Sequence, residues 1–160
     1  MSRAFVKEDG PDNAPLPDLP ISSHPNYVTE SGLAQLQDRL AARQADLTAL
    51  RLRADRLDRL PEAAAERDIR YLDARLRSAI LVPDTPAPQT VSFGVRVAVR
   101  DETGHLQTWR IVGEDEADGS AGLIAPQAPL ARALMGAEPG DDIDWFKPSG
   151  TITLTILSLA

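Results

Sequence analysis

The fold of the second half of this chain is decided by the stretch Trp109-Arg110-Ile111-Val112-Gly113-Glu114-Asp115-Glu116-Ala117-Asp118. The apolar residues up to Val112 are typical of a strand, and the glycine and acids that follow are typical of a turn. Acidic side chains in such a turn accept hydrogen bonds from backbone N–H groups or face water, so we expect a structural role for them. The letters Asp-Glu-Ala-Asp also occur in helicases, but the sequence lacks the Gly-x-x-x-x-Gly-Lys-[Ser/Thr] loop that helicases need to hold nucleotide phosphates.

The residues around this stretch predict a small sheet. An apolar residue recurs at every second position upstream, which predicts a strand with one buried face: Val91, Phe93, Val95, Val97 and Val99. A turn at residues 101–104 leads into the strand at 106–112. The downstream pattern predicts a short helix and then two strands, at residues 129–135, 143–146 and 151–157. We therefore expect an antiparallel sheet with one covering helix, in a chain of the α+β class.

The first half of the chain has helical periodicity. Apolar residues alternate in steps of three and four along an a/d seam that only Arg43 interrupts: Leu33, Leu36, Leu40, Arg43, Leu47, Leu50, Ala54 and Leu57. Thr29 is predicted to cap this helix. Pro61 suits the first turn of a second helix, whose seam is Ala65, Ile69, Leu72, Leu76 and Ala79. The pattern predicts an antiparallel coiled-coil hairpin that turns near residues 55–61, with helices of about 40 Å and about 30 Å.

Prolines mark the boundaries between these parts. Residues 1–27 contain five prolines and scattered acids, which predicts an extended Pro-rich arm. Residues 28–82 form the predicted hairpin. Residues 83–90 contain three prolines and are predicted to be a stiff linker to the sheet domain at 91–160.

Composition narrows the possible functions. The chain has 24 acidic and 17 basic residues, so it lacks the basic footprint of a duplex-binding protein; a protein partner with basic grooves is favoured, with nucleic acid reached only indirectly. There is no cysteine, and His24 and His105 have no matching ligands nearby in the sequence, so no metal site is predicted. No apolar run approaches the ~20 residues of a membrane helix, and we expect a soluble, cytoplasmic protein with no membrane contact.

Several of these strings resemble the C-terminal domain of the GreA/GreB family of bacterial transcription elongation factors. In that family the acidic turn reads I-V-G-x-D-E-A-D, a short helix reads S-P-x-A-R-A-L-x-G, and a G-D precedes the last strands. The corresponding strings here lie at residues 111–118, 129–136 and 140–141. The segment from Val28 to Leu36 is similar to the start of the family's hairpin, I-T-x-E-G-x-x-x-L. The resemblance implies an FKBP-like fold for residues 91–160, RNA polymerase as the partner, and no enzymatic activity of the chain's own.

In this family the hairpin tip carries the function, and it reads G-D-x-x-E-N-A-E-Y. Its acids enter the secondary channel of RNA polymerase and help hold a second magnesium ion, so that polymerase cleaves its own backtracked RNA. The resemblance makes Asp58 and Glu62 the candidate tip acids here. Arg59 takes the family's Asp position and Ala63 its Asn position, while Arg56 adds a further positive charge near the cation. We therefore expect weak or absent cleavage stimulation. A solvated tip without a metal role is the alternative, and no cofactor is expected because magnesium would belong to polymerase.

The family's polymerase-docking loop reads I-S-x-x-S-P, and the matching residues are Ile124-Ala125-Pro126-Gln127-Ala128-Pro129. By resemblance, Gln127, Ala128 and Pro129 are the candidate polymerase-binding residues, although Ala125 and Ala128 lack the family's hydroxyl groups.

The sequence thus predicts a Gre-type factor, and a monomer, whose hairpin enters the secondary channel of RNA polymerase. Two alternatives remain open. One is a regulator resembling Rnk, which blocks the channel with a short arm. The other is a scaffold that dimerises through its heptads and does not contact polymerase; its mass would depend on concentration, whereas that of a folded-back hairpin would not.

Overall fold

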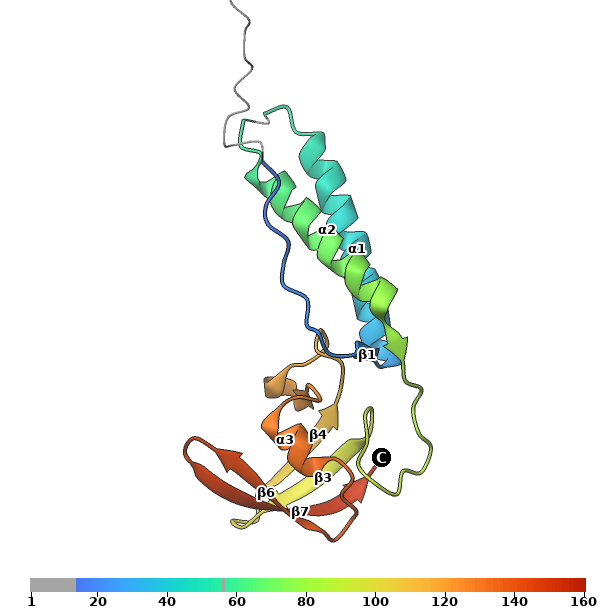
Figure 1. Ribbon diagram of the computed structural model, residues 1–160, viewed down its shortest axis with the longest axis vertical. Coiled ribbons are helices and arrows are strands. Elements are labelled where there is room, and N and C mark those ends of the chain that lie inside the picture. Colours follow the sequence, from blue (N-terminus) through green and yellow to red (C-terminus); the bar gives the residue numbers. More distant parts are fainter. Residues whose placement is uncertain (1–13, 56) are drawn as a thin grey trace, which may run out of the picture. The chain divides into compact units, whose positions relative to one another are not determined.

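The computed structural model describes residues 14–55 and 57–160, which form two compact units (Figure 1). The first unit contains residues 14–23 and 37–77, and the second contains residues 24–36 and 78–160. The first half of the predicted arm, residues 1–13, and the tip residue Arg56 lie outside the described residues.

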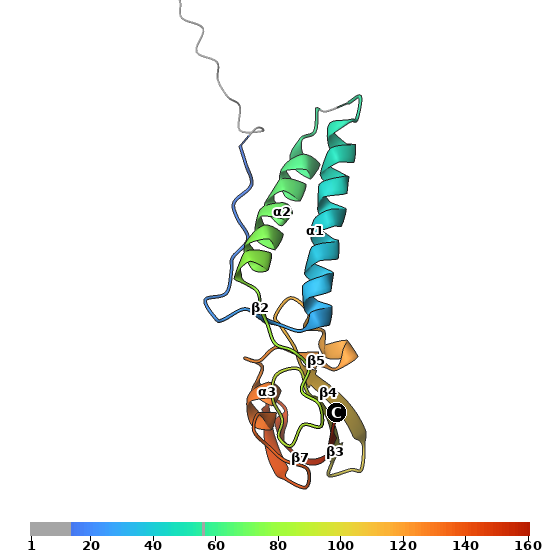
Figure 2. The same cartoon turned by 90° about the vertical axis from the view of Figure 1, so that its right-hand side faces the viewer.

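Two helices form the predicted hairpin. Helix α1 spans Glu30–Arg51 and helix α2 spans Leu60–Ser78, and the two lie side by side in both views (Figures 1 and 2). Leu47 of α1 and Ala65 and Leu72 of α2 are buried, as the heptad seams predict. The helices are also joined by ion pairs from Arg43 to Asp68 (3.3 Å) and from Arg51 to Glu66 (2.8 Å).

Helix α1 ends earlier than its heptad pattern predicts. At 22 residues it is about 33 Å long rather than about 40 Å, and Ala54 and Leu57 lie outside it, exposed to solvent. The cause is local hydrogen bonding that competes with the helix. Arg53 donates to the Leu50 carbonyl and to the Asp58 carbonyl, and the Asp55 carboxylate accepts from the Leu57 backbone N–H.

The first turn of α1 belongs to the second unit and is held by the acidic turn of that same unit. Thr29 caps the helix as predicted, because its hydroxyl oxygen accepts from the Gly32 backbone N–H at 2.9 Å. The same hydroxyl lies 2.5 Å from Glu116 Oε2, and the Ser31 hydroxyl donates to Glu116 Oε1 at 2.6 Å. Gly32 leaves room for this carboxylate, since a Cβ there would lie 2.5 Å from Glu116 Oε2.

The acidic turn was therefore only partly predicted. Asp118 behaves as expected: it is exposed and accepts from the Ser120 backbone N–H at 2.9 Å, which caps the short 3-10 helix η2, Gly119–Ala121. Glu116 does not face water. It is buried and accepts hydrogen bonds from side chains 85 and 87 residues earlier in the chain.

The sheet of the second unit has the order β5-β4-β3-β7-β6 (Figure 1). Its strands are β3 (Arg96–Asp101), β4 (Leu106–Ile111), β5 (Leu123–Ile124), β6 (Asp142–Lys147) and β7 (Gly150–Leu159). The pairs β4–β3, β3–β7 and β7–β6 are antiparallel, as predicted, whereas the two-residue strand β5 pairs with β4 in parallel. Helix α3, Pro129–Leu134, packs Leu130, Ala131 and Leu134 into the core of the sheet. The predicted α+β class is confirmed.

Two features of the second unit were not predicted. Strand β1, Tyr27–Val28, pairs in parallel with strand β2, Ile80–Leu81. The chain also enters β3 through a turn at Phe93-Gly94 with Gly94 at φ +87°, so the predicted strand begins at Arg96 rather than Val91. Val91 and Val95 are buried nonetheless. In the described part of the chain, no helix is long and apolar enough to cross a membrane.

Candidate functional site: the tip of the helical hairpin

The loop that joins α1 to α2 is organised by its aspartates. The Asp55 and Asp58 carboxylates accept from the backbone N–H groups of Leu57 (2.9 Å) and Leu60 (3.0 Å), each two residues later. Such Asx turns fix a tight bend and start the next helix. Helix α2 then begins with the Ala63 N–H donating to the Arg59 carbonyl at 3.0 Å. Asp58 therefore has a structural role at the tip.

Glu62 lies in the first turn of α2, and its side chain is only 2% exposed. Arg59 Nη2 lies 3.5 Å from Glu62 Oε2. A buried carboxylate needs a compensating positive charge, and the guanidinium group supplies one. The negative charge of Glu62 is thus compensated within the protein itself.

A pocket of about 440 Å³ lies at this tip. Its polar walls are Asp58, Arg59, Glu62 and Glu66, and its apolar walls are Ala14, Pro15, Leu16, Leu57, Leu60 and Ala63. The structure therefore brings the two predicted tip acids, Asp58 and Glu62, to one pocket. Sequence analysis missed Glu66, which could have been found because residues i and i+4 share a helix face. Glu66 also pairs with Arg51, at 2.8 Å.

The tip also exposes apolar side chains. Leu52, Leu57 and Leu60 are 81%, 93% and 61% exposed, respectively. In the described part of the chain, no group of three or more His, Asp or Glu side chains is placed to hold a metal ion.

The second candidate site is the loop before α3. Ala128 is the N-cap residue of α3, where it has extended backbone angles and makes no side-chain cap, and Pro129 occupies the first turn. Gln127 and Ala128 are half-buried, and Pro129 is exposed. The loop thus starts a helix at the position where the family places a serine hydroxyl.

Comparisons with known proteins show which proteins this chain is similar to. The family model "Transcription elongation factor, GreA/GreB, C-term" matches residues 85–160. Transcription elongation factor GreA of Pseudomonas putida is 38% identical over 101 residues, which cover 61% of this chain and 63% of that protein's length. Transcription elongation factor GreA of Roseiflexus castenholzii is 31% identical over 156 residues, which cover 87% of this chain and 99% of the relative. The solved structure of a GreA/GreB factor from Nitrosomonas europaea has a TM-score of 0.42 at 22% identity, covering 84% of this chain and 98% of that one.

The structure has a helical hairpin, and the family model identifies the part that follows it as a GreA/GreB C-terminal domain. The near-complete coverage of the Roseiflexus relative extends the likeness to the hairpin. The chain belongs to the GreA/GreB family of transcription elongation factors.

Proposed function

We propose that this protein binds RNA polymerase in the cytoplasm as an elongation factor, with its hairpin inserted in the secondary channel. The observation that carries the proposal is a folded-back pair of helices with a polar tip pocket, in a chain of the GreA/GreB family. Docking through Gln127, Ala128 and Pro129 is part of the same proposal, supported by their place directly before α3. The chain acts on polymerase and has no enzymatic activity of its own.

Stimulation of transcript cleavage is weak or absent in this proposal. A second magnesium ion needs free carboxylates at the tip. Glu62 and Glu66 are instead engaged by Arg59 and Arg51, and Asp58 accepts a hydrogen bond from the Leu60 backbone. An arginine about 4 Å from the incoming cation adds a repulsion of about 4 kcal/mol per unit of cation charge at an effective dielectric of about 20. One or two kcal/mol of this in the transition state lowers the rate about tenfold.

A second candidate function is that of a channel-blocking regulator resembling Rnk. It is favoured by the same arginine-paired acids and by the exposed leucines Leu52, Leu57 and Leu60. A blocking hairpin needs affinity for the channel and does not need a cation site. A heptad scaffold without polymerase contact is disfavoured, because the seam residues Leu47 and Leu72 are already buried in the folded-back chain. Light scattering at several protein concentrations distinguishes the scaffold from a monomer.

The test is a cleavage assay on backtracked RNA polymerase, following shortening of the RNA 3′ end. We expect the unaltered protein to bind polymerase, to compete with a GreB-type factor, and to shorten the RNA little or not at all. Strong shortening that is lost in Asp58→Ala or Glu62→Ala would contradict this and make those two residues the functional pair. Asp55→Ala is the matched control, since Asp55 is a tip acid that does not line the pocket.

A further inference from the structure

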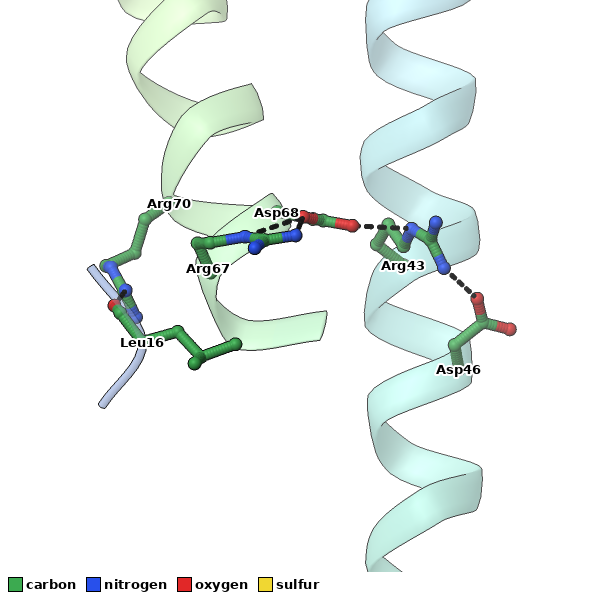
Figure 3. Close-up of polar contacts among 6 residues, drawn as sticks. All are labelled: Leu16, Arg43, Asp46, Arg67, Asp68 and Arg70. Atoms are coloured by element: carbon green, nitrogen blue, oxygen red, sulfur yellow. Dashed lines mark hydrogen bonds and ion pairs between the residues drawn. The ribbon is translucent and has the colours of Figure 1, made fainter. Parts of the chain in front are cut away.

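Residues 14–19 of the Pro-rich arm lie along the hairpin, beside α2 (Figure 2). Arg70 of α2 holds them by two contacts. Its Nε lies 2.6 Å from Asp18 Oδ1. Its Nη2 donates to the Leu16 carbonyl at 2.8 Å, as Figure 3 shows. One guanidinium therefore binds both a side chain and the backbone of the arm.

A second arginine of α2, Arg67, makes a different set of contacts. Arg67 pairs with Asp68 at 3.0 Å, and the other oxygen of Asp68 reaches Arg43 of α1 at 3.3 Å (Figure 3). This chain of charges joins the two helices, and none of its ion pairs involves a residue of the arm. Arg67 and Arg70 thus form a matched pair of surface arginines, of which Arg70 holds the arm.

Apolar side chains of the segment line a pocket at each of its ends. Leu16 and Leu19 are half-buried. Leu16 lines the tip pocket together with Ala14 and Pro15, and Leu19 lines a second pocket of about 410 Å³ beside Tyr71 and Leu72. Prolines restrict the backbone here and lower the entropy lost when the segment binds. The arm therefore supplies one wall of the pocket that contains Asp58 and Glu62.

The attachment is nevertheless weak. The side chains of Asp18 and Arg70 are 75% and 41% exposed. An ion pair this exposed changes an equilibrium by no more than about fivefold, and salt screens it. A segment held in this way can be displaced by a partner that makes modest contacts with the same surface.

We propose that residues 14–19 are a releasable strap, clamped by Arg70, that covers one wall of the tip pocket in the free protein and leaves when the hairpin binds RNA polymerase. The release step rests on the proposed function. A partner that contacts the tip acids must share the pocket with Ala14, Pro15 and Leu16, so strap and partner compete. In such a competition, the apparent Kd for the partner equals the intrinsic Kd divided by the fraction of molecules whose pocket is open, so the strap weakens binding.

The strap is tested in the protein alone. The chain has no cysteine, so spin labels on Ala14→Cys and Ala45→Cys report the distance from the arm to α1 without background. We expect a narrow distance distribution that broadens in Arg70→Ala and at high salt, and that stays narrow in Arg67→Ala. The double charge swap, Asp18→Arg with Arg70→Asp, is expected to give a narrower distance distribution than either of these two substitutions alone. A distribution that is equally broad in the unaltered protein, or unchanged by Arg70→Ala, would overturn the strap.

Release is tested by polymerase binding. We expect Arg70→Ala to bind RNA polymerase about two- to fivefold more tightly than Arg67→Ala, and the label distance to broaden when polymerase is added. Weaker binding of Arg70→Ala would overturn release and make the arm part of the binding surface. Absence of binding by the unaltered protein would overturn the proposed function and with it the release step. The label distances in the protein alone test the strap independently of polymerase.

Discussion

Glu116 connects two segments that are far apart in the sequence. Its carboxylate accepts hydrogen bonds from Thr29 and Ser31 in a buried position beside the first turn of α1. Charge-assisted hydrogen bonds of this kind are stronger than neutral ones. The negative charge also suits the helix N-terminus, where backbone N–H groups point outward.

Replacing this carboxylate tests its contribution. We expect Glu116→Ala to lower the free energy of unfolding by about 2 kcal/mol, because the hydroxyl groups of Thr29 and Ser31 then lose the charged acceptor of their hydrogen bonds. Glu116→Gln keeps an acceptor and is expected to cost less. Urea denaturation measures both, with the turn substitution Glu102→Ala as the control. A loss under 0.5 kcal/mol (about the noise of a surface substitution) for Glu116→Ala would mean that the contact adds little.

A second carboxylate sets a pH dependence in the β3–β4 turn. Asp101 accepts from the Thr103 hydroxyl (2.7 Å) and from the backbone N–H groups of Thr103 and His105. The Thr103 hydroxyl above all, and then the His105 N–H, hold the pKa of Asp101 below its ordinary value of 3.8. Because the folded pKa is the lower one, the turn is stabilised above about pH 4 and loses this stabilisation as the pH falls through the folded pKa.

Removing the hydroxyl is expected to return the pKa of Asp101 toward 3.8. NMR titration of the Asp101 carboxyl in Thr103→Val measures the change. The Asp118 carboxyl, whose pKa is lowered mainly by Ser120, is the internal reference and should not move. An Asp101 pKa that stays low in Thr103→Val would show that the backbone donors suffice.

At the scale of elements, the hairpin depends on its seam. Leu47 is 8% exposed and Leu50 is half-buried. We expect Leu47→Asp with Leu50→Asp to melt the hairpin, because each change places a charge in the apolar seam. Leu47→Ala alone should cost about 2–5 kcal/mol.

Circular dichroism follows the helices, and Trp109 and Trp145, which pack edge-to-face in the sheet, give a separate fluorescence signal for the second unit. Helicity should fall while the tryptophan signal persists. Ala45→Asp, at an exposed site on α1, is the control. Simultaneous loss of both signals would contradict the division of the chain into two compact units.

Elements with a strong local pattern were predicted from the sequence. Thr29 at the helix start and the heptad leucines predicted the hairpin, and the alternating valines predicted β3.

The features that the sequence did not predict depend on distant or competing contacts. The two-residue strands β1 and β2 are too short to show alternation. The leucine spacing continues to Leu57, although the hydrogen bonds of Arg53 and Asp55 end α1 before that residue. Nothing near Glu116 in the sequence indicates its hydrogen-bond partners. The resemblance named Asp58 and Glu62 as candidate tip acids, whereas the arginine pairing of Glu66 was not predicted.

At the scale of the whole molecule, the loop before α3 is expected to set affinity for polymerase. Gln127→Asp with Ala128→Ser restores the family's polar residues and should tighten binding severalfold. Ala128→Ser alone supplies the missing helix cap and should stabilise the protein by about 1 kcal/mol. Binding measured for each single variant and for the double variant separates the two effects. Unchanged affinity in the double variant would contradict the assignment of this loop.

The parallel pairing of β1 with β2 has a consequence for how this protein can change in evolution. A chain that leaves one parallel strand must return to the same end before it enters the next, and here the hairpin makes that return, with 22 residues out and 19 back. Growth or shrinkage of the hairpin is therefore tolerated when both helices change by equal numbers of turns. Because the helices already differ, by 22 residues against 19, the turn at the tip takes up an unequal change, and Ile80 stays in register with Tyr27.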